Sequence, residues 1–310
     1  METVLITGGT GLIGKGLTNV LLEKEYAVII LTRSPGKSIS TNPQLSYASW
    51  DIEKQAIDSA AIEKANYIIH LAGASVAEKR WTDRRKKEIL DSRVKSSALL
   101  ADAVRKYGNN LKAFISSSAI GFYGADNFSN GNQQKFFEND LPTTDFLGST
   151  CKKWEESIEP VASLGKRLVK LRTGIVLSND GGALKEFTRP LKFGLATILG
   201  NGKQIISWIH IGDLVNMFLH AVENEKMNGV YNAVAPKPVS NKELILQLAK
   251  KRNRFFIPFY VPSFILKIVL GEMSIEVLKS ATVSSAKIEE SGFEFLYPTI
   301  ETAISNLTGK

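Results

Sequence analysis

The sequence predicts an α/β fold in which helices cover both faces of a parallel sheet. Short β-branched runs, such as TVLIT from Thr3 and AVIILT from Ala27, alternate with helical patterns at residues 12–25 and 83–107. This alternation is typical of βαβ units. The predicted strands are almost wholly apolar, as burial on both faces of a doubly wound sheet requires. At 310 residues the chain is longer than one compact core usually allows, so we expect a smaller second lobe.

The remaining elements place this second lobe in the later part of the chain. Further strands are expected at 67–73, 112–118 and 167–176, with a helix from Lys152. After Val176 the sequence becomes rich in loops and glycine, and an apolar strand and helix resume at 206–226. Ser240 followed by Glu243 is typical of a capping box at a helix start. We therefore predict one lobe from 1–176 with 206–226, and another from 177–205 with 227–310.

Composition narrows the class of protein and its partners. Apolar residues make up 44% of the chain and charged residues 23%, as in soluble globular proteins. Lys and Arg exceed Asp and Glu by 39 − 31 = 8, which favours an anionic small molecule or nucleic acid. The basic run from Glu78 is either a solvated helix with ion pairs or a nucleic-acid patch. The acidic residues at helical spacing favour the helix, so no nucleic-acid partner is expected.

Cysteine, histidine and hydrophobic segments exclude several other kinds of site. Cys151 is a single cysteine, so no internal disulfide is expected, and the three histidines lack metal-ligand spacing, so no metal site is expected. The longest apolar stretch starts at Phe255, but Pro258, Pro262 and Lys267 interrupt it before the roughly 20 residues of a membrane helix. No membrane association is expected, and the absence of a secretory segment at Met1 predicts a cytoplasmic protein. The oligomeric state is not predicted.

The glycine pattern in VLITGGTGLIG predicts a dinucleotide site. Gly9-x-Gly11-x-x-Gly14, with Gly8 as an alternative first glycine, follows a strand and opens a helix. Glycines permit a tight turn, close approach of the backbone to a pyrophosphate, and close packing of the helix. The helix N-terminus would then face the phosphates with free N–H groups. The expected fold is thus a Rossmann domain.

The end of the second strand favours NADP over NAD. Arg33, between Thr32 and Ser34, stands where an acidic residue would hold a ribose 2′-hydroxyl. A guanidinium can instead pair with a 2′-phosphate, although Arg33 could also be an exposed arginine at a strand end. Asp51 is a candidate acceptor for the adenine amino group, or else a helix cap.

Taken in order, these motifs resemble a known family. TGGTGLIG, IIHLAGA, ISSSAIGFYG, LRTGIVL, SWIHIGDLV and YNAVAP are similar to extended or atypical short-chain dehydrogenase/reductases. RWT, WEE, GGAL, SWIH and NAVAP resemble the NAD-dependent epimerase/dehydratase branch with its C-terminal domain, whose members are sometimes labelled sugar-nucleotide epimerases and sometimes cell-division inhibitors. The resemblance implies an NADP-binding Rossmann domain with a C-terminal lobe that closes over a substrate.

The resemblance also implies which residues contact the cofactor. Leu71, Ala72 and Gly73 would line its central part, and Val176 would flank the nicotinamide. Arg93 replaces the asparagine usual in extended members and would contact phosphate or substrate. The full candidate set for the cofactor is Gly8, Thr10, Gly11, Leu12, Ile13, Gly14, Thr32, Arg33, Ser34, Asp51, Leu71, Ala72, Gly73, Arg93 and Val176.

The catalytic set of the family is incomplete in this sequence. Ser118, or Ser117 if the register slips by one, matches the family's serine. The tyrosine of its Tyr-x-x-x-Lys pair is missing, since FLGSTCKKWEE has Leu147 or Gly148 in its place and Cys151 or Lys152 in the place of the lysine. A lysine in this pair lowers the pKa of the tyrosine so that it can exchange a proton with substrate.

Two interpretations follow from the missing tyrosine. In the first, Tyr123 serves as the acid/base and Lys152 holds the nicotinamide ribose, so that the protein is an oxidoreductase or epimerase acting on a hydroxyl or carbonyl compound, including a nucleotide sugar. Tyr123 could equally be a structural aromatic. In the second, the chain is a catalytically weak or silent regulatory protein that binds NADP(H). Cys151 is expected to be buried and inert, and His70, His210 and His220 to be structural.

Overall fold

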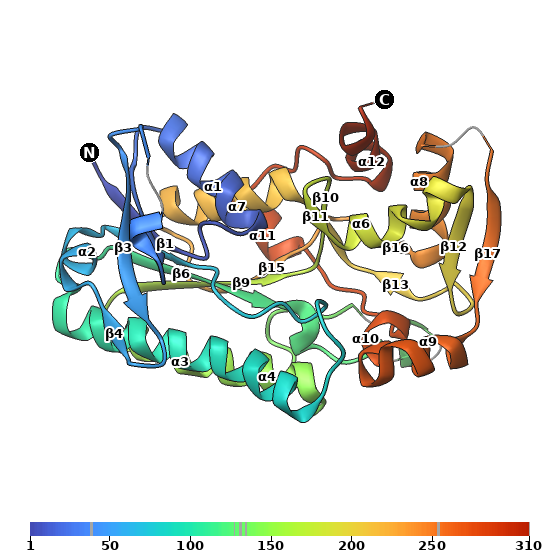
Figure 1. The fold of residues 1–310 in the computed structure, drawn as a ribbon, viewed down its shortest axis with the longest axis horizontal. Coiled ribbons are helices and arrows are strands. Elements are labelled where there is room, and N and C mark those ends of the chain that lie inside the picture. The colour runs from blue at the N-terminus through green and yellow to red at the C-terminus, as the bar shows by residue number, and fades with distance from the viewer. Residues whose placement is uncertain (38–39, 127, 130–131, 134, 253–254, 310) are drawn as a thin grey trace.

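A mostly parallel sheet of eight strands forms the centre of the fold (Figure 1). The computed structural model describes residues 1–309, apart from 38–39, 127, 130–131, 134 and 253–254. In spatial order the strands are β15 (Gly229–Ala233), β9 (Arg167–Thr173), β6 (Ala113–Ala119), β5 (Tyr67–His70), β1 (Thr3–Thr7), β2 (Ala27–Thr32), β3 (Leu45–Asp51) and β4 (Ala56–Ile57). All neighbours pair in parallel except β3 and β4. The chain order reverses between β1 and β5, where α/β sheets bind ligands at the carboxyl ends of the strands.

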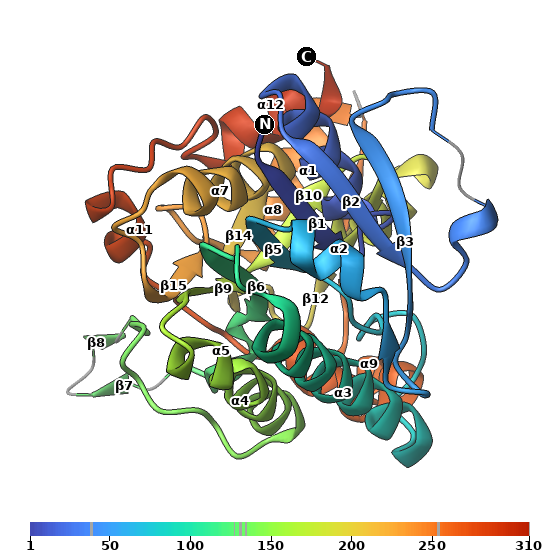
Figure 2. The same ribbon diagram turned by 90° about the vertical axis from the view of Figure 1, so that its left-hand side faces the viewer.

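Helices cover both faces of this sheet, so the predicted doubly wound α/β fold is confirmed. The elements on one face are α1 (Leu12–Glu23) and α7 (Ile211–Glu223), and those on the other are α2 (Ser59–Lys64), α3 (Asp83–Tyr107), α4 (Phe146–Ile158) and α5 (Pro160–Ser163). Figures 1 and 2 show the sheet between the two layers. Side chains alternate between them, because Ile6 of β1 packs in the cluster with α1 and α7 whereas Leu5 packs in the cluster with α2 and α3.

The rest of the chain forms smaller sheets and short helices. The additional strands are β10 (Ile175–Ser178), β11 (Gly181–Gly182) and β14 (Trp208–His210) in one sheet, β12 (Leu195–Leu199) with β17 (Ile257–Val261), β13 (Ile205–Ile206) with β16 (Val239–Ser240), and β7 (Phe128–Ser129) with β8 (Asn132–Gln133). The additional helices are α6 (Ala183–Thr188), α8 (Asn241–Arg252), α9 (Ser263–Leu270), α10 (Ser274–Leu278), α11 (Ala286–Glu290), α12 (Ile300–Thr308) and the 3₁₀ turns η1 (Pro35–Lys37), η2 (Ile120–Phe122), η3 (Pro190–Phe193) and η4 (Gly271–Met273). A core around Trp208 unites α6, α8 and α12.

Three elements differ most from the sequence-based expectations, and the strand expected at 67–73 ends earlier, at His70. Residues 167–176 are not one strand, because the chain leaves the large sheet at Gly174 and β10 pairs with β14 instead. The helix expected from Lys152 begins at Phe146, where the Asp145 carboxylate caps it by accepting from the Gly148 N–H at 2.8 Å. Residues 229–233, which we expected in the second lobe, form the edge strand β15. The division into two lobes stays a proposal. Because β15 belongs to the large sheet, the last segment of the second lobe would begin after Ala233 and not at residue 227.

Other expectations about the fold concern helix starts and membrane spans. The Ser240 hydroxyl caps α8 by accepting from the Glu243 N–H at 3.1 Å. The predicted helix at 83–107 is α3, whose basic residues form ion pairs such as Arg85–Glu88 at 2.8 Å. Across the described part of the chain, the helices are all too short or too polar to cross a membrane.

Candidate functional site

The glycine turn joins β1 directly to α1. Gly8 has φ +72°, a conformation that other residues rarely adopt, and its carbonyl oxygen accepts from the Gly11 N–H at 3.0 Å. A Cβ on Gly14 would lie 2.3 Å from the Gly8 oxygen and 2.5 Å from Gly9 Cα. The helix therefore packs on the turn at a distance that only glycine allows.

The first turn of α1 is open to an anion. Gly11 is the N-cap, so no side chain caps the helix, and the first turn carries no acidic residue. Thr10 and Gly11 are exposed, and Leu12 and Ile13 are half-buried. The free N–H groups and the positive end of the helix dipole thus face outward beside the glycine turn.

A second backbone segment lies against the glycine turn. A Cβ on Gly8 would lie 3.1 Å from the Ala72 nitrogen and from the Leu71 carbonyl carbon. The Thr7 hydroxyl oxygen holds this segment in place by accepting from both the Leu71 and Ala72 N–H groups at 3.2 Å. The structure thus brings together Gly8, Leu71 and Ala72, which the sequence predicted to share one ligand.

His70 holds the Thr7 hydroxyl in position through a hydrogen bond. Its Nδ1 lies 2.7 Å from Thr7 Oγ1 and its Nε2 lies 3.2 Å from Ser96 Oγ. Burial lowers the pKa of His70 to about 3, with the Arg93 charge adding to the effect, so the ring is neutral. Because Thr7 accepts two N–H bonds, its own O–H is free to donate to Nδ1. The arrangement agrees with the structural role expected for His70.

Arg93 and Gly73 complete this side of the site. The Arg93 Nη1 donates to the Ala74 oxygen at 3.0 Å and to the Ile89 oxygen at 2.9 Å, and the guanidinium lies over the Trp154 ring. A Cβ on Gly73 would lie 3.1 Å from Arg93 Cζ. Burial lowers the pKa of Arg93. Arg93 thus contacts the Ala74 loop, the backbone of its own helix and the Trp154 ring, and its contact with phosphate or substrate stays a proposal.

Arg33 stands at the tip of β2 in an open position. Its side chain is exposed, and the adjoining Ser34 N–H donates to Thr32 Oγ1 at 3.3 Å. Arg33 and Asp51 line one open pocket of about 390 Å³ together with residues of β3 and β4. Asp51 Oδ1 accepts from the Glu53 and Lys54 N–H groups at 3.0 Å, so it caps the turn between these strands and not a helix.

Val176 of β10 lies near the first residue of α1. A Cβ on Gly182 would lie 3.5 Å from Leu12 Cδ2 and 3.6 Å from the Val176 oxygen. The Gly181–Gly182 turn therefore lies next to the first residue of α1 and to β10. The sequence analysis did not assign this turn to the cofactor site, although the GGAL motif, which contains both glycines, was a sequence signal for it.

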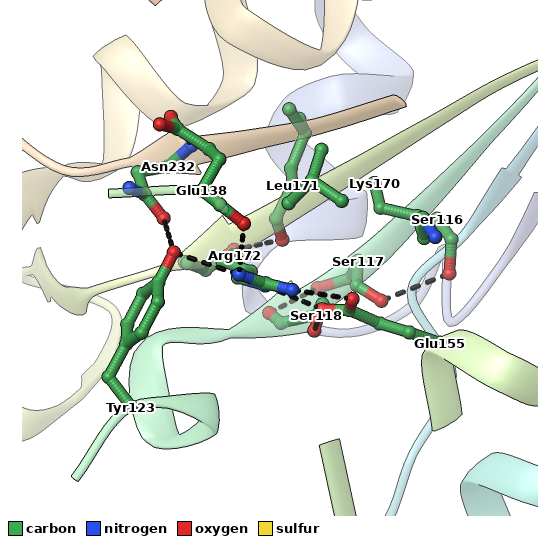
Figure 3. Close-up of polar contacts among 12 residues, drawn as sticks. Ser116, Ser117, Ser118, Tyr123, Glu138, Glu155, Lys170, Leu171, Arg172 and Asn232 are labelled. Atoms are coloured by element: carbon green, nitrogen blue, oxygen red, sulfur yellow. Dashed lines mark hydrogen bonds and ion pairs between the residues drawn. The ribbon is translucent and has the colours of Figure 1, made fainter. Parts of the chain in front are cut away.

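Two of the candidate catalytic residues, Ser118 and Tyr123, belong to one buried polar network (Figure 3). The Arg172 guanidinium lies at its centre and forms a two-point ion pair with Glu155, Nε to Oε1 and Nη2 to Oε2, both at 2.8 Å. Ser118 Oγ donates to Glu155 Oε1 at 2.7 Å. Arg172 Nη1 donates to Tyr123 Oη at 2.9 Å, and Tyr123 Oη donates to Asn232 Oδ1 at 2.7 Å. Glu155, Arg172 and Asn232 were not predicted from the sequence.

Tyr123 is held inside this network. Its side chain is fully buried and stacks on Phe136 with ring centroids 5.1 Å apart. Burial raises the pKa of Tyr123 to about 12, although the Arg172 charge opposes the shift. With its hydroxyl both donating and accepting inside the protein, Tyr123 fits the structural alternative better than the acid/base role.

The lysine of α4 points away from the network. The Lys152 side chain is 56% exposed and its Nζ lies 3.7 Å from Glu156 Oε1 on the same outer surface. The inward face of α4 carries Leu147, Cys151 and Glu155, at four-residue spacing. Leu147 packs against Gly121, and burial raises the pKa of the Cys151 thiol to about 12. The structure therefore does not bring Lys152 together with Ser118 or Tyr123.

Ser117 and Ser118 occupy opposite faces of β6. Ser118 is buried against Glu155, whereas Ser117 is half-buried and its hydroxyl donates to the Ser118 oxygen at 3.4 Å. His210 and His220 also contact protein groups, because His210 Nδ1 accepts from the Gly212 N–H at 3.0 Å and His220 Nε2 lies 3.3 Å from the Ser291 oxygen. Within the described residues, no cluster of three His, Cys, Asp or Glu side chains could hold a metal ion.

Family models match parts of this chain, and known proteins are similar to it over its length. The NAD dependent epimerase/dehydratase family matches residues 4–146, and a domain of unknown function (DUF1731) matches residues 261–307. An epimerase family protein of Staphylococcus aureus is 34% identical over 310 residues, covering all of both chains.

Two solved structures share the whole fold. The human epimerase family protein SDR39U1, crystallised with NADPH, has a TM-score of 0.84 and 27% identity over 99% of both chains. A nucleoside-diphosphate sugar epimerase from Corynebacterium glutamicum has a TM-score of 0.77 and 30% identity over 99% of this chain and 58% of its own. The chain, alike over its full length to an epimerase family protein, thus belongs to the NAD-dependent epimerase/dehydratase family.

Proposed function

We propose that this protein binds NADP(H) and uses it as an oxidoreductase or epimerase on a hydroxyl or carbonyl compound. The observation that carries the proposal is Arg33, exposed at the carboxyl end of β2 and next to the strand whose end carries the glycine turn. A guanidinium at this point can form an ion pair with a 2′-phosphate, whereas an acidic residue would repel the phosphate.

The residues present fit the cofactor. Gly8 and Gly14 form a turn that a Cβ would fill, and the uncapped first turn of α1 offers N–H groups to a pyrophosphate. Leu71, Ala72 and Gly73 would pass beside its centre, and Thr32 and Ser34 would flank its 2′-phosphate. Asp51 Oδ2, which lies 3.9 Å from Lys54 Nζ, would accept from the adenine amino group, and Val176 would flank the nicotinamide. When bound, the cofactor supplies hydride transfer.

Two relatives support the choice of cofactor and substrate class. The human relative crystallised with NADPH favours NADP(H) for this chain. The Corynebacterium glutamicum relative, a nucleoside-diphosphate sugar epimerase, favours a nucleotide-linked sugar as the substrate. We propose that this substrate binds to the second lobe, residues 177–205 and 234–310, which leaves β15 with the large sheet.

Arg33→Asp tests the cofactor. Calorimetry should show NADPH affinity falling about 10- to 100-fold, since a charge-assisted hydrogen bond is worth about 1.5–3 kcal/mol, while NADH affinity changes little. Arg84→Asp, at an exposed arginine of α3, is the matched control and should leave both affinities unchanged. Equal losses for NADPH and NADH in Arg33→Asp would count against the 2′-phosphate role.

A second candidate is an NADP(H)-binding regulatory protein without catalysis. The observation that favours it is the placement of Tyr123 and Lys152. The Tyr123 hydroxyl is buried and hydrogen-bonded to Asn232 and Arg172, and Lys152 forms an ion pair with Glu156 on the surface. Purified protein with NADPH and a panel of sugar nucleotides, aldehydes and ketones separates the candidates. Turnover that Ser118→Ala or Ser117→Ala abolishes supports the enzyme, and tight NADPH binding without turnover of any compound supports the regulatory protein.

A further inference from the structure

Large apolar side chains are exposed along β17 and α9. The most exposed are Phe193 at 80%, Phe255 at 76%, Ile268 at 69%, and Phe264 and Val269 at 63% each. Soluble proteins rarely expose so many large apolar groups in one region unless the region binds something. The interrupted apolar stretch from Phe255 therefore forms a surface and not a core.

These side chains lie on segments that are paired through the backbone or follow one another in the chain. The Ile257 N–H donates to the Gly194 oxygen at 2.8 Å, which places Phe193 beside the start of β17. β17 pairs only with β12 among the described strands, and four of its five residues are exposed. Pro262 joins β17 to α9, where Phe264, Ile268 and Val269 continue the exposed row. We call this surface the β17–α9 face.

The charges around this face are positive. The described residues of 244–271 include no Asp or Glu but include Lys250, Lys251, Arg252 and Lys267. The acidic residues that follow are neutralised, because Glu272 pairs with Lys86 at 2.8 Å and Glu276 pairs with Lys279 at 2.7 Å. Lys192, next to Phe193, and Lys267 form no ion pair with any described residue.

The positive charge of the β17–α9 face indicates which kind of partner binds there. A second copy of this chain would bring the same cations against one another, and like charges across an interface oppose association. A lipid surface with anionic headgroups matches both properties, since it accepts apolar side chains at the acyl boundary and attracts Lys and Arg.

We propose that the β17–α9 face binds the surface of membranes that contain anionic lipids. The helix α9 would lie on the membrane and not cross it, as its eight residues allow. Figure 1 shows β17 at the opposite end of the molecule from β3, which lines the Arg33 pocket, so the proposed cofactor site stays open to solvent. This proposal departs from the sequence-based expectation of no membrane association, which rested on the interruption of the apolar stretch from Phe255 by Pro258, Pro262 and Lys267.

Sedimentation of the full chain with vesicles tests this proposal. With vesicles of phosphatidylglycerol and phosphatidylcholine at low salt, we expect at least about tenfold stronger partitioning than with phosphatidylcholine alone, and a decrease at high salt. Phe264→Asn combined with Ile268→Asn should weaken binding at least about tenfold. Leu296→Asn is the matched control, because Leu296 is 62% exposed on another part of the surface.

A charge variant and a mass measurement complete the design. Lys267→Gln and Lys192→Gln should each weaken binding to the anionic vesicles about fivefold, with little effect on neutral ones. Thermal melts of each variant verify that it is folded. Absent or equal partitioning to both vesicles would overturn the proposal. So would light scattering that shows a dimer which the Phe264/Ile268 variant dissociates, because the face would then belong to a second copy.

Discussion

Tyr123→Phe separates the structural from the catalytic role of the buried tyrosine. The substitution keeps the ring and its stacking on Phe136 but removes the hydroxyl. Asn232 Oδ1 then loses the donor that lies 2.7 Å away, whereas Arg172 Nη1 keeps the Glu138 oxygen at 3.1 Å. One buried acceptor is left unsatisfied, which costs about 1–3 kcal/mol.

The assay is thermal or urea unfolding beside NADPH turnover. A loss of 1–3 kcal/mol corresponds to a Tm lower by about 2–5 °C in a chain of this size. Tyr107→Phe, at a tyrosine that is 37% exposed, is the matched control and should change the free energy of unfolding by less than about 0.5 kcal/mol. Unchanged stability together with turnover reduced on the order of a hundredfold would refute the reasoning, since the hydroxyl would then act on substrate.

Three further predictions rest on other buried contacts. Glu155→Gln leaves the buried Arg172 charge unpaired and should lower the free energy of unfolding by about 3–5 kcal/mol, measured by urea denaturation. Gly14→Ala places a Cβ 2.3 Å from the Gly8 oxygen and should abolish NADPH binding in calorimetry, and normal affinity would contradict the close packing. The pKa of His70 in the folded chain is about 3, below its unfolded value of 6.5, so the unfolded chain takes up a proton first as the pH falls. The contribution of neutral His70 to stability is therefore retained above pH 6.5. The free energy of unfolding should fall by up to about 1.4 kcal/mol per pH unit as the pH drops from 6.5 toward 3. His70→Asn should flatten that slope.

Much of the fold was predictable because its signals are local. Thr3–Thr7, Ala27–Thr32 and Asp83–Tyr107 have the predicted bounds, since an apolar run or a helical period lies within each segment. The departure of the chain at Gly174 was not predictable from this stretch. It depends on pairing with residues some thirty positions later, where the Ile175 N–H donates to the Ser207 oxygen at 2.9 Å. The edge strand β15 likewise depends on its distant partner β9.

The difference between local and long-range signals also separates the cofactor residues from the buried polar network. Gly8, Gly11, Gly14 and Arg33 form a consecutive pattern whose geometry follows from a strand, a turn and a helix. The polar network does not, because Ser118, Tyr123, Glu155, Arg172 and Asn232 come from separate elements and meet only after packing. An arginine inside the apolar run RLVKLRT was the available sequence signal, since a charge buried in a strand requires a partner.

The register of α4 decides which residues can take part in chemistry. A Tyr-x-x-x-Lys pair requires both side chains on the inward face, and four-residue spacing repeats along one face of a helix. Burial of Trp154, Glu155 and Ile158 sets that face, which places Cys151 inward and Lys152 outward. Turning α4 to bring Lys152 inward would remove Glu155 from Arg172 and leave a buried guanidinium unpaired, so the ion pair opposes the rotation. Ser118 donates to Glu155 of this helix, whereas Ser117 lies on the opposite face of β6, so turnover of Ser117→Ala and Ser118→Ala has to be measured separately to find which hydroxyl exchanges a proton with substrate.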